Sequence, residues 1–200
     1  MTASQSTPRL RLTVWLLVAA LALVTVSERT FCGGLAGELM QLAGLACIAC
    51  AALGRIWTSA FIAGFKDTSL VQEGPYSALR HPLYALSLLA MLGVGLATRS
   101  IAITLFLVAA FVAIYLRAAR REDAYLAQAH GRAHAGYGQR LRAFWPDFRE
   151  YHVPESIEVR PRVFWKAFLD AGSLLGFYVL IRIADLLQVH GIAPTWLSLP

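Results

Sequence analysis

Charged residues are scarce in this sequence, and their scarcity excludes an ordinary soluble domain. Asp, Glu, Lys and Arg make up 15% of the 200 residues, hydrophobic residues make up 58%, and the mean hydropathy is +0.56. A soluble domain of this length carries more charge, about 25%, and less apolar surface. We therefore predict an all-α integral membrane protein.

Cysteine is also rare, which argues against a metal centre built on thiolates. The Cys47-x-x-Cys50 pair lies in an apolar stretch, with no second pair to complete a metal site. His130 and His134 stand four apart, a spacing that can bind metal, but no third ligand is obvious. We expect no metal site. No basic face on a soluble module is visible either, which excludes a nucleic-acid partner.

The apolar residues gather in runs, and a helix that crosses a bilayer needs about 20 such residues. The last run carries Arg182 and Asp185, which stand three apart and can pair on one helix face. We predict five transmembrane helices, with four crossings and one interfacial helix as the alternative. The five runs are residues 12–27, 31–54, 83–98, 101–116 and 164–187.

The basic residues orient these helices. With the N-terminus in the cytoplasm, 2 Lys and Arg lie in the inner tail, 3 between residues 55 and 82, and 10 between residues 117 and 166. The outer side receives only Arg29 and Arg99. This distribution follows the positive-inside rule, so the net charge of +6 indicates orientation and anionic headgroups. We therefore expect the segments 55–82 and 117–163 to face the cytoplasm, at the inner membrane if the source is bacterial.

The chain divides into three expected regions. Residues 1–54 form an N-terminal two-helix hairpin, residues 55–148 a central core, and residues 149–200 a linker with the C-terminal helix. As one helix, residues 83–116 would measure about 50 Å, which is too long for a single crossing. They must fold back as an antiparallel hairpin at Thr98-Arg99-Ser100. Both ends of that hairpin return to the cytoplasmic side.

The stretch "GPYSALRHPLY", residues 74–84, places polar and conformationally restricted residues beside an apolar run. Pro82 suits the first turn of a helix, which makes His81 a helix cap. A helix start offers free N–H groups and partial positive charge, a site for a carboxylate or a phosphate. The Gly74-Pro75 turn can bring Tyr76 over the same place. The alternative is an interfacial girdle that only anchors the helix end.

The other end of the predicted hairpin supplies acidic side chains. "RAARREDAYL", residues 117–126, leaves the membrane on the same side as His81. Glu122 and Asp123 can therefore lie close to His81, although some forty residues separate them in the sequence. The alternative is a solvated acidic pair that balances the neighbouring arginines.

Together these segments resemble the isoprenylcysteine carboxyl methyltransferase family and its phospholipid methyltransferase relatives. The family pattern runs from G-x-Y and R-H-P-x-Y, through a helix hairpin, to E-E-x-x-L and F-G-x-x-Y-x-x-Y near a proline. Here it covers about residues 54–146. The resemblance implies S-adenosylmethionine as cofactor, bound at the cytoplasmic face between the R-H-P-x-Y helix start and the acidic pair. It also implies methyl transfer to a lipophilic small molecule or a lipid.

Carried over residue by residue, the resemblance implies a role in the site for Glu122. Arg117, Arg120 and Arg121 are candidates to orient an acceptor carboxylate, and we expect Arg117, Arg121 and Glu122 to be the catalytic residues. A helix start can hold the methionine carboxylate, and an acidic side chain can take the amino group or the ribose. Tyrosine rings attract the sulfonium cation by roughly 0.5–2 kcal/mol. The implied cofactor contacts are Thr68, Ser69, Leu70, Val71, Tyr76, His81, Pro82, Leu83, Tyr84 and Glu122.

The sequence departs from the family pattern at several positions. Leu86 stands where glycine is usual, and Ala118 stands where an arginine on the substrate side would fall. Arg117 takes that role only with a shift of one residue. Further replacements are Asp123, His130 and His134.

The expected acceptor is an isoprenylcysteine-type carboxylate, with the amine of phosphatidylethanolamine as the alternative. A carboxyl group with a pKa of about 4 is ionised at neutral pH and needs no base, only an arginine to orient it. An amine must first lose a proton to a base such as Glu122, Asp123 or His81. An NADPH-dependent membrane reductase of the sterol reductase type is a further alternative, because such enzymes contain a segment resembling R-H-P-x-Y. The third alternative is a catalytically inactive membrane protein that keeps the fold, which the departures at Leu86 and Ala118 leave open.

Overall fold

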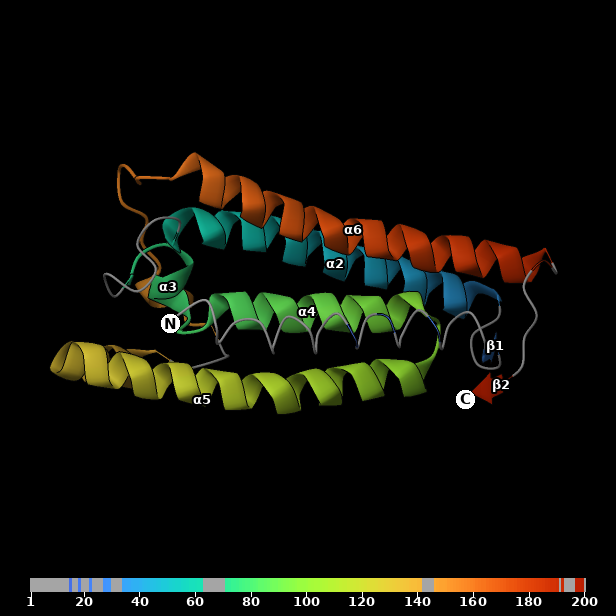
Figure 1. The fold of residues 1–200 in the computed structure, drawn as a ribbon, viewed down its shortest axis with the longest axis horizontal. Coiled ribbons are helices and arrows are strands. Elements are labelled where there is room, and N and C mark those ends of the chain that lie inside the picture. Colours follow the sequence, from blue (N-terminus) through green and yellow to red (C-terminus); the bar gives the residue numbers. More distant parts are fainter. Residues whose placement is uncertain are drawn as a thin grey trace. The chain divides into compact units, whose positions relative to one another are not determined.

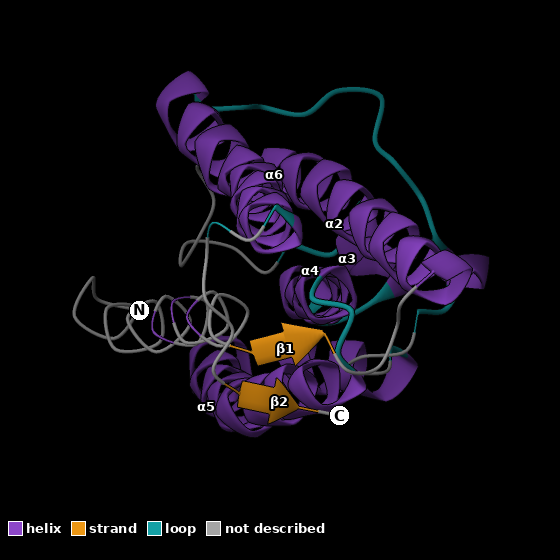
Figure 2. Ribbon diagram, turned by 90° about the vertical axis from the view of Figure 1, so that its right-hand side faces the viewer, coloured by secondary structure: helices purple, strands orange, loops and turns teal. Residues whose placement is uncertain are grey.

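The structure is a computed structural model, and it describes residues 34–62, 71–141, 146–190 and 192, together with 15, 18, 22, 27–29 and 197–199. Two strands of three residues, β1 (Ser27–Arg29) and β2 (Leu197–Leu199), pair in parallel with Ser27 opposite Leu197 (Figure 2). The other regular elements are helical, which confirms the all-α prediction. They are α2 (Gly34–Ile62), α3 (Pro75–Ala78), α4 (Pro82–Ala97), α5 (Ile101–Arg140), the 3-10 turn η2 (Phe148–Glu150) and α6 (Pro161–Val189) (Figure 1).

Three of these helices are long and apolar enough to cross a membrane. Within the described residues they are Gly34–Ile62, Ile101–Gln128 and Pro161–Gln188, and the apolar helix Pro82–Ala97 is shorter. They correspond to four of the five predicted runs and fit an all-α integral membrane protein. The remaining run, residues 12–27, lies almost wholly outside the described residues. Its crossing and the cytoplasmic location of the N-terminus remain predictions.

Helix α2 continues beyond the apolar run from which it was predicted. The run ends at residue 54, but the helix ends at Ile62, so the expected connecting segment begins later. Residues 55–62 contain no glycine or proline to stop the helix. They also pack well: Thr58 is 1% exposed and Phe61 5%, and the Trp57 and Phe61 rings meet edge to face at 4.9 Å.

Helices α4 and α5 form the predicted antiparallel hairpin around Thr98–Ser100. No residue of α4 is exposed, whereas α2, α5 and α6 each have exposed residues. Contacts between residues far apart in the sequence establish the pairing: a Cβ added to Gly95 would lie 2.6 Å from Thr104 Cα, and the Tyr84 hydroxyl donates to Glu122.

Residue contacts divide the chain into two compact units. The first comprises residues 1–50, 88–114 and 172–200, and the second comprises residues 51–87 and 115–171. The candidate site lies in the second unit.

A buried polar cluster lies within the first unit. Gln41, 3% exposed, accepts hydrogen bonds from Arg99 at 2.9 Å and from Arg182, and donates to Asp185 at 3.3 Å. Arg182 pairs with Asp185 at 2.8 Å, which confirms the pairing predicted from their spacing. Arg99 also pairs with Glu38. The cluster therefore connects α2, the α4–α5 turn and α6.

Candidate active site

The start of α4 fixes the central residues of the site. The helix begins at Pro82, as predicted, and the His81 carbonyl accepts hydrogen bonds from the N–H groups of Tyr84 and Ala85, each at 3.1 Å. Proline fits this first helical position because no N–H is needed there. The His81 side chain is 5% exposed, so its ring is held inside the protein at the mouth of the helix.

Two adjacent carboxylates on α5 meet this helix start. Tyr84 donates its hydroxyl to Glu122 Oε2. Asp123 lies beside His81, with 3.1 Å between Oδ1 and Nε2, and beside Arg80, with 3.5 Å between Oδ2 and Nη1. The structure therefore brings together the two sequence segments that were expected to meet. The Asp123 carboxylate holds α5 against the start of α4, and Glu122 adds a second link one residue away.

Aromatic rings also gather where α5 meets the start of α4. The Tyr84 ring stacks on His81 with centroids 5.5 Å apart and meets Tyr115 of α5 edge to face at 5.2 Å. Tyr115 lies seven residues before Glu122, and this spacing puts both on one face of a helix. Tyr84 therefore combines a hydroxyl bound to a carboxylate with a ring that has aromatic neighbours on two sides.

The turn before α4 is held by a segment that follows α5. Gly74 has a φ of +57°, a conformation that L side chains rarely adopt, and its N–H donates to the His152 carbonyl at 2.9 Å. Ser77 accepts from the His152 N–H at 3.1 Å and donates to the Gly74 carbonyl at 2.6 Å. These bonds fix α3, on which Tyr76 is 9% exposed.

The other implied cofactor contacts divide into two groups. Pro82 is buried, and Val71 and Leu83 are half-buried. Thr68, Ser69 and Leu70 lie outside the described residues. His130 and His134 belong to α5, but their side chains are also outside the described part.

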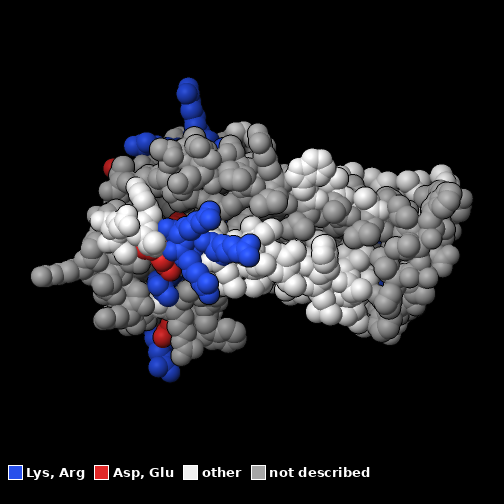
Figure 3. Space-filling model, turned by 60° about the horizontal axis from the view of Figure 1, so that its bottom comes forward, with Lys and Arg blue, Asp and Glu red and all other residues white. Residues whose placement is uncertain are grey.

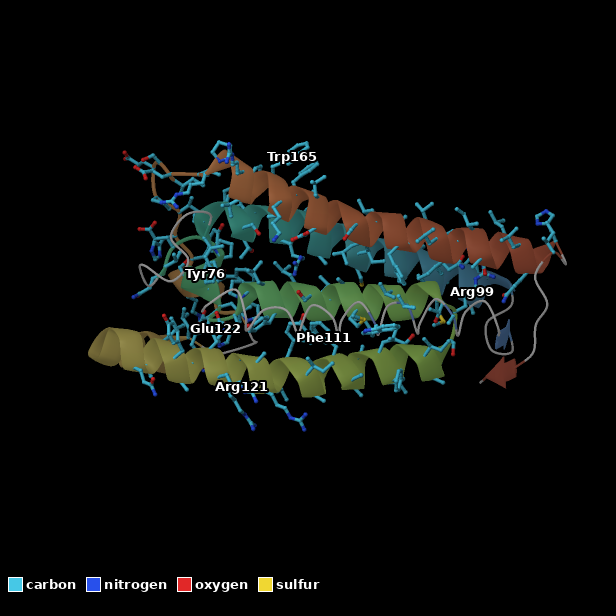
Figure 4. The ribbon with its side chains drawn as sticks, in the orientation of Figure 1. Tyr76, Arg99, Phe111, Arg121, Glu122 and Trp165 are labelled. Atoms are coloured by element: carbon cyan, nitrogen blue, oxygen red, sulfur yellow. The ribbon has the colours of Figure 1, made fainter. Side chains whose placement is uncertain are left out.

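The three arginines of α5 whose side chains are described lie on a different face from Glu122. Arg117, Arg120 and Arg121 are exposed, whereas Ala118 is 6% exposed. Figure 4 shows Arg121 pointing away from the side of α5 that carries Glu122, and Figure 3 shows basic side chains gathered on the surface formed by α5. The structure therefore brings Glu122 into the site, and no described contact connects Arg117 or Arg121 to Glu122 or Tyr84.

Three residues of this region were not singled out from the sequence: Arg55, Ser87 and Tyr115. Arg55 on α2 donates Nη1 to Ser87 Oγ, and Ser87 lies one helical turn after Tyr84. The available signals were an arginine inside an apolar helix and an aromatic residue seven positions before Glu122.

The arrangement can bind a ligand that carries both charges. Glu122 Oε2 accepts from Tyr84, and the other carboxylate oxygen has no recorded partner among the described residues. Arg80 Nε is buried without a hydrogen-bond partner in the described part of the chain. The site thus offers an acceptor for a cationic group, a donor for an anionic group, and aromatic rings between α4 and α5.

Comparison with known proteins agrees with this geometry. The phospholipid methyltransferase family profile matches residues 36–133, a stretch that contains Arg55, His81, Tyr84 and Glu122. No solved protein structure gives a significant match.

Two curated relatives match nearly the whole chain. The cobalt-zinc-cadmium resistance protein CzcN of Cupriavidus metallidurans is 33% identical over 186 residues, covering 92% of this chain and 86% of the relative. The nickel-cobalt-cadmium resistance protein NccN of Alcaligenes xylosoxydans xylosoxydans is 29% identical over 195 residues, covering 96% of this chain and 91% of the relative. The matched profile and the meeting of the R-H-P-x-Y helix start with the acidic pair place this chain in the phospholipid methyltransferase family, with its isoprenylcysteine carboxyl methyltransferase-like members.

Proposed function

We propose that this protein is an S-adenosylmethionine-dependent membrane methyltransferase that transfers a methyl group to a lipophilic acceptor, most favourably an isoprenylcysteine-type carboxylate. The observation that carries the proposal is the joint placement of Tyr84, Glu122, His81 and Asp123 where α5 meets the start of α4. The family to which the chain belongs supports methyl transfer in general.

The residues present fit the proposed cofactor. The unpaired oxygen of Glu122 suits the amino group, and Arg80 Nε with the start of α4 suits the carboxylate. The rings of Tyr84 and Tyr115 suit a sulfonium, because aromatic faces attract cations. When bound, S-adenosylmethionine would supply an electrophilic methyl group. The protein's own contribution is positioning, which can contribute on the order of 7–11 kcal/mol to a reaction between well-oriented groups.

The acceptor determines whether the site needs a base. A carboxylate acceptor is already ionised at neutral pH, so this reaction asks only for orientation and exclusion of water. The alternative acceptor is the amine of phosphatidylethanolamine, supported by the phospholipid methyltransferase profile. That amine must lose a proton. Because Glu122 is assigned to the cofactor, the candidate base is the His81–Asp123 pair, whose Nε2 and Oδ1 atoms lie 3.1 Å apart.

The names of the two relatives suggest where a phenotype would appear. Both are called metal resistance proteins, for cobalt, zinc and cadmium in one case and nickel, cobalt and cadmium in the other. We propose that methylation by this protein contributes to growth in the presence of such metals. Growth of a deletion strain on cobalt, zinc, cadmium and nickel, complemented with the parent or with Glu122→Ala, tests this role directly.

The deciding experiment is a calorimetric titration of the purified full chain in detergent with S-adenosylmethionine, S-adenosylhomocysteine and NADPH. We expect micromolar binding of the two adenosyl ligands, lost in His81→Ala and Glu122→Ala. Glu155→Ala removes an exposed carboxylate elsewhere and is the matched control. Binding of NADPH alone would instead assign the protein to the sterol reductase type, and no binding of any ligand would refute an active enzyme.

A further inference from the structure

Arg55 is a cation inside an apolar helix that the proposed cofactor site does not use. It lies in the last third of α2 and is half-buried. Its Nη1 donates to Ser87 Oγ, and Ser87 Oγ in turn donates to the Leu83 carbonyl at 2.7 Å. No ion pair of Arg55 is present among the described residues. A charged side chain near the cytoplasmic end of a membrane helix faces a partner, a polar cavity or the headgroup region.

The groups around Arg55 connect it to the site. Tyr115, Asp170 and Tyr76 are the titratable groups that surround its guanidinium. Tyr115 contacts the Tyr84 ring, which places Arg55 near the same aromatic rings as Glu122. Asp170 is the carboxylate among these three groups, and its side chain is exposed.

Among the α5 side chains that the structure describes, no cation lies on this side of the site. Ala118 and Ala119 are 6% and 4% exposed, and neither carries a charge. Arg117, Arg120 and Arg121 are exposed on the other face of the helix. Arg80 pairs with Asp123 and is assigned to the carboxylate of the cofactor. Of the described guanidinium groups, Arg55 is therefore the best placed to meet an anion that enters between α2, α4 and α5 in the second unit.

We propose that Arg55, supported by Ser87, forms the subsite that holds the anionic head of the lipophilic acceptor. This inference rests on the proposed methyltransferase function. A guanidinium offers several N–H donors in a planar fork, and Ser87 occupies one of them, so others can grip a carboxylate or a phosphate. The bound anion would neutralise Arg55 within the helix bundle, and the attached hydrocarbon would remain in the apolar surroundings.

Three probes with the same farnesyl tail and different heads test the proposal. They are N-acetyl-S-farnesylcysteine, its carboxamide, and farnesyl phosphate, titrated against the full chain in detergent. We expect the parent to bind at least one anionic probe about 10- to 100-fold more tightly than the carboxamide, as one charge-assisted interaction allows. The stronger of the two anionic probes identifies a carboxylate or a phosphate head.

The variants separate this subsite from the cofactor site. In Arg55→Gln we expect the preference for the anionic probe to disappear and the affinity for S-adenosylmethionine to stay unchanged. In Arg55→Lys we expect part of the preference for the anionic probe to remain. Arg162→Gln, at an exposed position, should behave as the parent. A parent that does not prefer an anionic head, or an Arg55→Gln variant that keeps the preference, would overturn the assignment. Joint loss of probe and S-adenosylmethionine binding in Arg55→Gln would overturn it too. A parent that binds the anionic probe but no adenosyl ligand contradicts the methyltransferase proposal alone.

Discussion

Replacing Asp123 by Asn tests whether one carboxylate holds α5 against the start of α4. Asp123 lies 3.1 Å from His81 Nε2 and 3.5 Å from Arg80 Nη1. The His81 side chain is 5% exposed and the Arg80 side chain 21%, so water replaces the lost carboxylate only in part. Hydrogen bonds to charged groups contribute about 1.5–3 kcal/mol, and the partial exposure of Asp123 lowers this, so we expect a loss of about 1–2 kcal/mol.

The assay is thermal unfolding of the purified chain in detergent, followed by tryptophan fluorescence. For a chain of this size a change of 1 kcal/mol corresponds to about 2–4 °C, so the Tm should fall by about 2–8 °C. Glu158→Gln removes a carboxylate at an exposed position and serves as the matched control. Equal Tm values for Asp123→Asn and this control would refute the role of Asp123 in joining the two helices.

Three further substitutions test contacts elsewhere in the fold, and the same unfolding assay measures each. Gly74→Ala should cost about 1–3 kcal/mol because Gly74 has a φ of +57°, and an unchanged Tm would contradict this. Gly44→Ala should cost about 1–3 kcal/mol, since its Cβ would lie 2.7 Å from a backbone oxygen of α4. Gly172→Ala meets no atom within 4 Å and is its control. Gln41→Leu should cost about 1–3 kcal/mol by removing the acceptor of Arg182 and the donor to Asp185, and an unchanged Tm would contradict this.

Hydrophobic runs were sufficient to predict the long helices but not all of their ends. The runs gave α4 and α6 within a few residues, because proline and polar turns stop them. Helix α2 passes residue 54 because the following residues, though more polar, are helix-compatible and pack around Thr58 and Phe61. The pairing of β1 with β2 joins residues some 170 positions apart, and no local pattern carries information about such a contact.

The site could be predicted where its residues form local motifs. The R-H-P-x-Y start and the acidic pair each have a recognisable pattern, and the hairpin between them implies that they meet. The periodicity of the helix was not applied to the arginines. Arg121 and Glu122 are adjacent and face different directions, whereas Ala118 and Glu122 are four apart and share a face. Arg55 was missed because its partner, Ser87, lies on another helix and the sequence alone does not pair α2 with α4.

Leu86 shows why a departure from a family pattern has to be judged in three dimensions. A Cβ added to Gly54 of α2 would lie 2.6 Å from Leu86 Cδ2, so the leucine side chain occupies space that a glycine on the other helix leaves open. The family pattern has its small residue at position 86, whereas here the close contact depends on Gly54.

We therefore expect Gly54→Ala to cost less than Gly44→Ala in the unfolding assay, because a flexible leucine end can move and a backbone carbonyl cannot. Adding Leu86→Ala to Gly54→Ala should remove the clash between the new Cβ and the leucine side chain. The double variant also loses the packing of the leucine methyl groups, which lowers stability. If Gly54→Ala and Gly44→Ala cost the same, the explanation fails; if they differ as expected, Leu86 is a repacked contact and gives no reason to regard the site as inactive.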